Sequence, residues 1–264
     1  MEFYAISNNI PVHISDTQKG ETTILLLHGY LETLYIFTEL EELLSKQFRV
    51  ISLDLPGHGL SGSNKDINTM SFMAAVAKDV LDICKVNKAY VAGHSMGAYV
   101  ALECFKYFPQ TFEGLIMLNS TPLPDNLDKK REREREIDLI AKDKLYTLAQ
   151  LSIPKMYAPI NRRRMDQKIE ETIENTQAHD PHGIIASIRG LIQREDNSEF
   201  MSTIKNGLLI FSELDTYVGP EIYNKIIPNY PQFNTLILPN CGHNSFIEEP
   251  IKCLQAIENF ILID

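Results

Sequence analysis

A serine between two glycines is the feature of this sequence that points most directly to chemistry. The segment reads Gly93-His94-Ser95-Met96-Gly97. A serine that attacks a carbonyl group must present its Oγ at the tip of a very tight turn, where the backbone passes close on both sides, and only glycine leaves that room. The spacing is typical of a nucleophile elbow, a sharp turn between a strand and a helix.

The residues around this serine fit such a turn. Residues 89–92 before it form a short apolar run of the strand type. After it, apolar residues recur at helical spacing from Ala98 to Phe105, and Pro109 ends the pattern. The sequence therefore predicts the strand, the turn and the helix that the motif requires.

A serine is a weak nucleophile unless a base accepts its proton, and the base needs an acid to orient it. His243 is the candidate base, because it lies in a loop directly after the last predicted strand. Three acids can lie at the same edge of the sheet: Asp215, which follows the apolar run at 208–211, and, with weaker support, Glu213 and Asp125. We favour Asp215, although an aspartate here also suits a simple turn.

The other histidines and the cysteines are assigned no catalytic role. Three histidines lie inside motifs but have no acid placed as a base requires: His28, His58 and His94. Three more are expected at the surface or in a helical segment that precedes residue 207: His13, His179 and His182. The four cysteines form no C-x-x-C pair and are expected to be free thiols, and no ligand set for a metal is present: Cys84, Cys104, Cys241 and Cys253.

The strands that must position these residues are visible as unbroken aliphatic runs that alternate with helical patterns. The runs are 24–27, 50–53, 89–92, 115–118, 208–211 and 236–238, and the helical patterns lie near 33–46, 71–86 and 251–261. Strands buried on both faces show such runs. The sequence therefore predicts an α/β fold with a mostly parallel central sheet and helices on both faces, preceded by a hairpin within residues 3–15.

The segment 122–206 has a different character, because it contains no clear strand. We expect it to be a helical cap inserted between two parts of the core domain, residues 1–121 and 207–264. Helices are predicted near 142–151, 165–178 and 182–192, and the run Lys129–Glu136 is expected to form a solvated helix with a partly apolar face. Such an insertion covers the carboxyl ends of the strands, where ligands of parallel sheets bind.

Composition excludes several classes of partner. The chain has 264 residues, of which 44% are hydrophobic, so it can bury the core of one domain with an insertion. Its net charge of −10 argues against nucleic acid or an anionic membrane as partner. Apolar runs stay well below the roughly 18 residues that a membrane span needs, and residues 1–4 lack the features of a signal peptide. We therefore expect a cytoplasmic protein.

Taken together, the motifs resemble the α/β-hydrolase superfamily, in the branch of small esterases and enol-lactonases with a helical cap. The matching segments are His28-Gly29-Tyr30, Asp54–Ser61, Gly93–Gly97, Leu214-Asp215, and Gly242-His243 followed by Glu249-Pro250. The order of nucleophile, acid and base in this superfamily is met by Ser95, Asp215 and His243. The resemblance covers nearly the whole chain outside the expected cap. Within the cap it identifies nothing.

The resemblance implies a site and an activity. It assigns the two donors of an oxyanion hole to the backbone N–H groups of Tyr30 and Met96. It implies a serine hydrolase that cleaves a carboxylic ester, lactone or thioester of a small molecule through an acyl-enzyme, without a cofactor. Carbon–carbon bond hydrolysis and a hydrolase-fold receptor with little turnover are the alternatives. The oligomeric state, monomer or homodimer, stays open.

Overall fold

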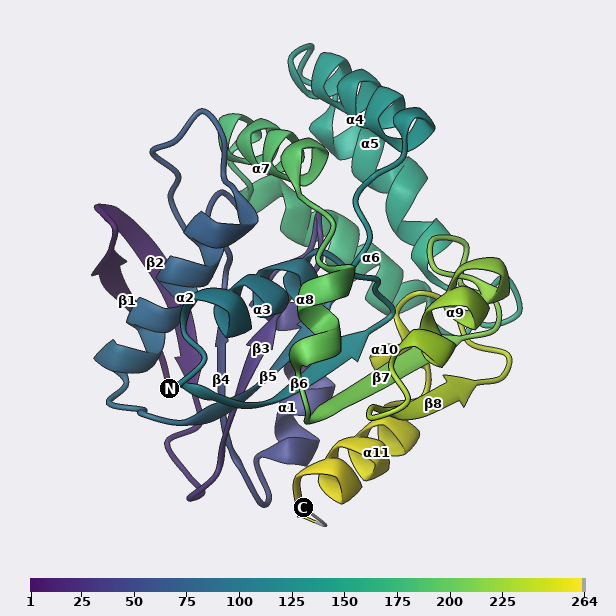
Figure 1. The fold of residues 1–264 in the computed structure, drawn as a ribbon. Helices are drawn as coiled ribbons and strands as arrows, with labels where there is room; N and C mark the ends of the chain where they lie inside the picture. The colour runs from purple at the N-terminus through teal and green to yellow at the C-terminus, as the bar shows by residue number, and fades with distance from the viewer. Residues whose placement is uncertain (263–264) are drawn as a thin grey trace.

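One sheet of eight strands forms the centre of the computed structural model, which describes residues 1–262 (Figure 1). The strands are β1 (Glu2–Ser7), β2 (Ile10–Asp16), β3 (Thr23–Leu27), β4 (Arg49–Leu53), β5 (Ala89–His94), β6 (Phe112–Leu118), β7 (Gly207–Ser212) and β8 (Asn234–Leu238). Their order across the sheet is β1-β2-β4-β3-β5-β6-β7-β8. β1 and β2 are antiparallel to their neighbours, and all other pairs are parallel.

The antiparallel edge of the sheet is the predicted hairpin. β1 and β2 pair from Glu2 opposite Ser15 to Ser7 opposite Ile10. Asn8 and Asn9 form the connecting turn with φ angles of 49° and 63°. A two-residue turn with positive φ at both positions matches the right-handed twist of the strands, and asparagine tolerates this conformation better than most residues. The local sequence alone therefore determines this part of the sheet.

Helices cover both faces of the sheet, as the alternating pattern predicts. One face carries α2 (Met70–Ile83), α3 (Met96–Tyr107) and α9 (Pro220–Ile226), and the other carries α1 (Thr38–Leu44), α10 (Ser245–Glu248) and α11 (Pro250–Leu262). Leu25 and Leu27 of β3 pack in the first layer, whereas Ile24 and Leu26 pack in the second. Because successive side chains of one strand enter opposite layers, every position of such a strand must be apolar.

The segment between β6 and β7 is helical. Its α-helices are α4 (Leu127–Ile140), α5 (Leu145–Ser152), α6 (Asp166–Asn175), α7 (Pro181–Gln193) and α8 (Ser198–Thr203), and it also contains the 3₁₀ helices η2 (Ile153–Met156) and η3 (Thr176–Ala178). Two further 3₁₀ helices lie outside this segment, η1 (Leu34–Phe37) and η4 (Ile227–Asn229). The helices α4 to α7 lie over the carboxyl ends of the parallel strands, at the top of Figure 1. α8 lies lower, where Met201 joins the same apolar cluster as α2 and α3. The predicted helices of this segment are present, with somewhat different ends.

The helical segment contacts the body of the protein at a turn that contains Gly57. A Cβ atom on Gly183, at the start of α7, would lie 2.5 Å from the Cα atom of Gly57, so the two backbones are in direct contact. Beside them, the Gly59 N–H donates to Nδ1 of His179 at 2.7 Å. The rings of His58 and His179 lie 5.3 Å apart, and burial lowers the pKa of both, that of His179 to about 4.

The expectation that His13 and His179 lie at the surface or in the helical segment is wrong for His13 and correct for His179, although His179 is buried there. His179 does belong to the helical segment, but it is 5% exposed, and His13 on β2 is 2% exposed. His13 Nδ1 lies 2.8 Å from an oxygen of Asp54. Groups distant in the sequence satisfy at least one nitrogen of each buried ring, and sequence spacing does not reveal these contacts.

Two further expectations concern cysteines and membranes. All four cysteines are free, as predicted, and all four are buried. No helix within residues 1–262 combines the length and the apolar character needed to cross a bilayer.

We predict that stability falls as the pH drops from about 6.5 to about 4, partly through His179. In the unfolded chain this ring titrates near 6.5, but in the folded chain its pKa is about 4. The unfolded state therefore binds more protons across this window, which for one such group reduces the free energy of unfolding by on the order of 3 kcal/mol. Urea unfolding at several pH values measures the loss.

The variants His179→Asn and His182→Asn separate this effect from other titrations. Asparagine at position 179 keeps an acceptor for the Gly59 N–H but cannot titrate, so the variant should lose less stability between the two pH values. His182 is exposed on α7, and its replacement should leave the pH dependence unchanged. Equal pH dependence in the wild type and in His179→Asn contradicts the prediction.

Candidate active site

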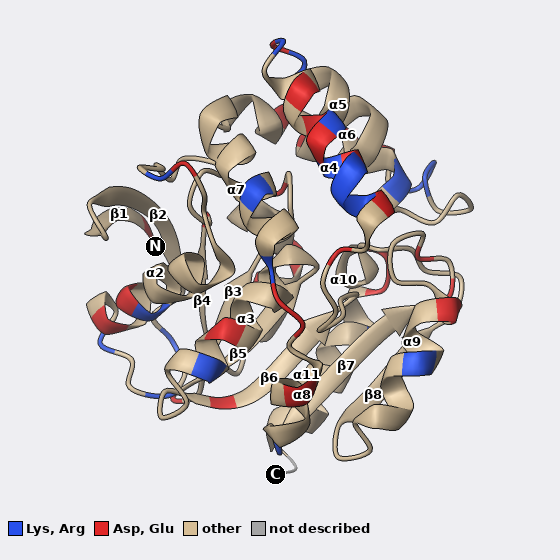
Figure 2. Cartoon of the chain, turned by 45° about the horizontal axis from the view of Figure 1, so that its top comes forward, with Lys and Arg blue, Asp and Glu red and all other residues tan. Residues whose placement is uncertain are grey.

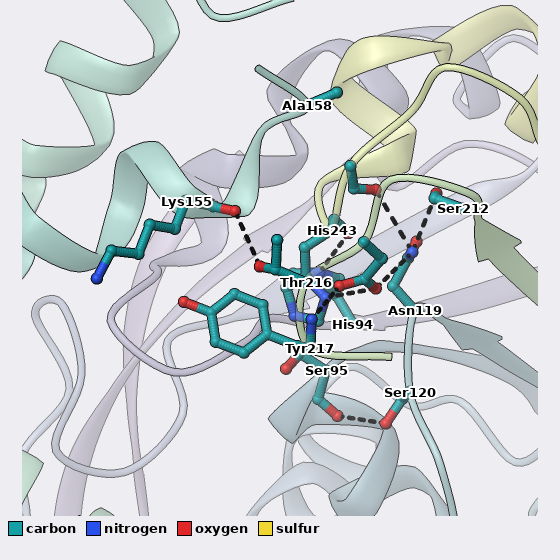
Figure 3. Close-up of polar contacts among 12 residues, drawn as sticks. His94, Ser95, Asn119, Ser120, Lys155, Ala158, Ser212, Thr216, Tyr217 and His243 are labelled. Atoms are coloured by element: carbon teal, nitrogen blue, oxygen red, sulfur yellow. Dashed lines mark hydrogen bonds and ion pairs between the residues drawn. The ribbon is translucent and has the colours of Figure 1, made fainter. Parts of the chain in front are cut away.

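Ser95 lies in the sharp turn between β5 and α3, as the glycine pattern predicts. Its backbone has φ 49° and ψ −110°, a conformation that L-residues rarely adopt. Its N–H donates to the Leu118 carbonyl at 3.0 Å, and the Ser120 hydroxyl donates to its carbonyl at 2.9 Å (Figure 3). Ser95 is partly exposed although His94 and Met96 are buried. The turn therefore presents the serine side chain to an open space.

The two glycines of the motif are required by close backbone contacts. A Cβ atom on Gly93 would collide with the main chain of Gly97, and one on Gly97 would collide with the carbonyl oxygen of Leu27. The second contact presses the start of α3 against the end of β3. The elbow and the loop after β3 are therefore held at a fixed distance.

His243 and Asp215 lie together at the same edge of the sheet. His243 follows β8, Asp215 follows β7, and His243 Nδ1 lies 2.9 Å from Asp215 Oδ2. Of the other acid candidates, Glu213 is exposed, and Asp125 pairs with Arg194 at 2.8 Å. The structure thus brings Asp215, and neither alternative, into contact with the candidate base.

Asn119, which the sequence did not single out, helps to hold Asp215. Its side-chain amide donates to Asp215 Oδ2 at 3.0 Å, and the Tyr217 N–H donates to Oδ1 at 2.7 Å. Burial alone would raise the pKa of Asp215, but His243 and these two donors hold the pKa below its usual range. Asp215 is therefore held as a carboxylate facing His243.

The two positions proposed for oxyanion donors flank the serine. Met96 is the first residue of α3, so its backbone N–H has no acceptor within the helix, and the positive end of the helix dipole lies there. Tyr30 lies in the loop after β3, which is closed by a hydrogen bond from the Gly29 N–H to Glu32 Oε2 at 2.7 Å. The role of both N–H groups stays a prediction.

A cavity of about 400 Å³ opens beside Ser95 and His243, and α4 forms part of its wall. Four charged side chains of this helix line the cavity: Lys129, Glu132, Arg133 and Glu136. The expectation of a solvated charged helix holds for the exposed positions of α4, Glu132 among them, but it is wrong for Arg133, whose side chain is only 12% exposed. Figure 2 shows both signs of charge along α4. The four residues of α4 that line the cavity recur at helical spacing. Because all four are charged, they form no apolar stripe in the sequence that would indicate a buried face.

Glu248 connects the helical segment to the loop of His243. It is 1% exposed and accepts hydrogen bonds from the Gly242 N–H at 2.8 Å, from the Ala158 N–H at 3.1 Å and from the Asn161 amide. Burial raises the pKa of Glu248, although these three donors oppose the shift. The sequence resemblance included the next residue, Glu249, but gave no sign that Glu248 is buried.

His94 also belongs to this region, and the expectation that it has no matching acid is wrong. Its Nδ1 lies 2.8 Å from Glu32 Oε2, and both side chains are fully buried. The acid comes from a loop 62 residues earlier, so spacing in the sequence does not indicate the pair.

Known proteins share this arrangement of strands and loops. Residues 22–250 match the family described as alpha/beta hydrolase fold. The chain belongs to this family. The match confirms both the predicted resemblance and the predicted fold class of this α/β hydrolase.

Individual relatives agree in length as well as in fold. This α/β hydrolase is similar to a pimeloyl-[acyl-carrier protein] methyl ester esterase of Nitrosomonas europaea, with 24% identity over 255 residues that cover 93% of this chain and 99% of the relative. Among solved structures, it is similar to a thermophilic esterase from Thermogutta terrifontis, with a TM-score of 0.91, 24% identity, and 99% and 98% of the two chains covered. An enol-lactonase from Burkholderia xenovorans LB400 gives a TM-score of 0.88 at 19% identity, with 98% and 99% covered.

We predict that Glu248→Gln lowers the free energy of unfolding of this α/β hydrolase by about 1.5–3 kcal/mol. Three donors face the carboxylate, and a glutamine would place its own N–H₂ group against one of them. Chemical denaturation measures the change. Glu249→Gln is the matched control, because Glu249 is partly exposed and pairs with Lys252 at 3.0 Å. Similar losses in the two variants would show that the Glu248 contacts contribute little.

Proposed function

We propose that this α/β hydrolase cleaves a carboxylic ester, lactone or thioester of a small molecule through an acyl-enzyme formed on Ser95. One observation carries the proposal: a partly exposed serine in a strained turn lines the same cavity as His243, whose other ring nitrogen is bound to a buried aspartate. The similar proteins include esterases and an enol-lactonase. The comparisons do not favour a carbon–carbon bond hydrolase or a receptor.

In the proposed reaction, His243 acts first as a base and then as an acid. Its Nδ1–H donates to Asp215, which leaves Nε2 unprotonated in the neutral ring and able to accept the proton of Ser95 Oγ. As Oγ attacks the carbonyl carbon, the N–H groups of Tyr30 and Met96 stabilise the negative oxygen. His243 Nε2 then protonates the leaving group, and water attacks the acyl-enzyme by the same steps.

The segment 122–206 acts, in this proposal, as a cap that selects the substrate. Its α4 supplies charged side chains to the cavity wall, and its position over the strand ends limits access of water to the reacting carbonyl. The proposed scheme needs no cofactor. A cytoplasmic location and a monomer or homodimer stay predictions.

We predict that a fluorophosphonate probe labels the wild-type protein and that Ser95→Ala abolishes both labelling and ester turnover. Alanine removes the only atom that forms the covalent bond. Gel-based labelling and hydrolysis of p-nitrophenyl esters of increasing acyl length measure the two effects. Ser152→Ala is the control, because Ser152 lines the same cavity but has no part in the proposed reaction, so this variant should keep both labelling and turnover. Labelling that persists in Ser95→Ala would exclude Ser95 as the nucleophile.

Asp215→Asn should lower kcat on the order of 10⁴-fold, as in other serine hydrolases where the aspartate fixes the histidine tautomer. An asparagine amide facing Nδ1 favours the tautomer with the proton on Nε2, which cannot accept the serine proton. Steady-state kinetics measure the change. Glu213→Gln, at the exposed alternative acid two residues earlier, should retain the wild-type rate. A strong loss in Glu213→Gln combined with an active Asp215→Asn would reverse the assignment.

A further inference from the structure

A second pair of a buried acid and an imidazole lies next to the Asp215–His243 pair. Glu32 Oε2 and His94 Nδ1 are 2.8 Å apart, and both side chains are 0% exposed. The other nitrogen of His94, Nε2, lies 3.1 Å from the carbonyl oxygen of His243. The proposed hydrolytic mechanism does not use this pair.

The partners of His94 indicate its protonation state. A carbonyl oxygen only accepts hydrogen bonds, so Nε2 must carry a proton. At the other nitrogen, Glu32 Oε2 already accepts the Gly29 N–H at 2.7 Å, which favours the carboxylate form. Burial would raise the pKa of Glu32, but His94 and the Gly29 N–H hold it below its usual range. A carboxylate at Nδ1 and a carbonyl at Nε2 together leave both ring nitrogens protonated.

The pair joins three parts of the proposed active site. Glu32 receives the N–H of Gly29, directly before the proposed oxyanion donor Tyr30. His94 directly precedes Ser95 in the elbow, and it donates to the main chain of His243. Each contact is therefore made either with a residue of the proposed mechanism or with its direct neighbour in the sequence.

The ring of His94 has little freedom to move. Its centroid lies 4.8 Å from that of His243 and 4.9 Å from that of Phe246, which meets it edge-on. An unpaired imidazolium so close to His243 would disfavour the positive charge that His243 must acquire during the reaction. The negative charge of Glu32 offsets this effect, so the pair can supply one fixed donor, to the His243 carbonyl, and one fixed acceptor, for the Gly29 N–H, without a net charge.

We propose that Glu32 and His94 are positioning residues for the hydrolytic reaction, with His94 held as an imidazolium that fixes the His243 loop and the oxyanion loop relative to Ser95. The expected effect of this pair on kcat rests on the proposed function. The charge state of His94 is independent of it.

The variants His94→Asn and His94→Gln test the contact with His243. The amide of asparagine occupies the place of Nδ1 and can bind Glu32 but cannot reach the His243 carbonyl, whereas the amide of glutamine extends toward the place of Nε2. We expect His94→Asn to lower kcat by roughly 10- to 100-fold, the effect of one lost charge-assisted hydrogen bond, with KM changed less than about threefold. His94→Gln should recover part of kcat.

His13→Asn is the matched control, because His13 and Asp54 form another buried pair at 2.8 Å that does not contact His243. It should lower stability and leave kcat and KM close to the wild-type values. If His94→Asn keeps kcat within about twofold of the wild type, or loses no more than His13→Asn, the positioning role is wrong.

A measurement on the wild-type protein covers the case in which the variants do not fold. Nitrogen-15 NMR of the histidine side chains near pH 7.5, with each ring assigned to its position, should show both nitrogens of His94 protonated. The assignment distinguishes His94 from His13, whose buried ring also faces carboxylates. A ring with only one protonated nitrogen overturns the inferred ion pair. Absence of ester turnover and of labelling in the wild type would instead contradict the proposed function, so the two failures are distinguishable.

Discussion

The left-handed backbone of Ser95 is the constraint on which the rest of the site depends. A non-glycine residue in such a conformation costs about 1–3 kcal/mol, which the surrounding structure must supply. Here β6 supplies part of it through the Leu118 carbonyl, and Ser120 binds the carbonyl of the strained residue. The contact between Gly97 and the end of β3 supplies another part by packing. The strands next to β5 therefore hold the proposed nucleophile in place and also carry the loops around it.

Three buried carboxylates surround this turn, and their differing pKa shifts reflect their partners. Asp215 and Glu32 each face an imidazole, and the pKa of each is lowered despite burial. The Glu248 carboxylate accepts hydrogen bonds from neutral N–H donors, with Arg164 bound to the main-chain carbonyl of the same residue, and its pKa is raised. For this carboxylate the desolvation outweighs its donors, whereas at Asp215 and Glu32 the adjacent histidine reverses the direction of the shift.

Local sequence was sufficient to predict the elbow and most of the strands and helices, and it favoured Asp215 and His243 as acid and base, whose catalytic roles stay predictions. These features depend on short-range spacing or on the position of a residue just after a strand. Asn119, Glu32 and Glu248 were missed because each acts through contacts with residues far away in the chain, and a polar residue after a strand or in a loop has no pattern that marks it as buried. The exposed Glu213 and the ion-paired Asp125 likewise became distinguishable from Asp215 only once the strands were placed.

The charged helix α4 forms part of the wall of the cavity beside Ser95 and His243, a position that its sequence could not reveal. Its charges pair along the helix, Lys129 with Glu132 at 2.8 Å, so the helix carries polar groups into the cavity wall without leaving each one unpaired. Two of its cations also contact aromatic rings of the site: Arg133 lies 5.1 Å from the ring centre of Tyr30, and Lys129 lies 5.4 Å from that of Tyr217. Tyr30 belongs to the proposed oxyanion loop, and Tyr217 donates its N–H to Asp215. Through these two rings α4 contacts both the proposed oxyanion loop and the loop that holds Asp215, so one helix of the cavity wall touches both sides of the proposed site.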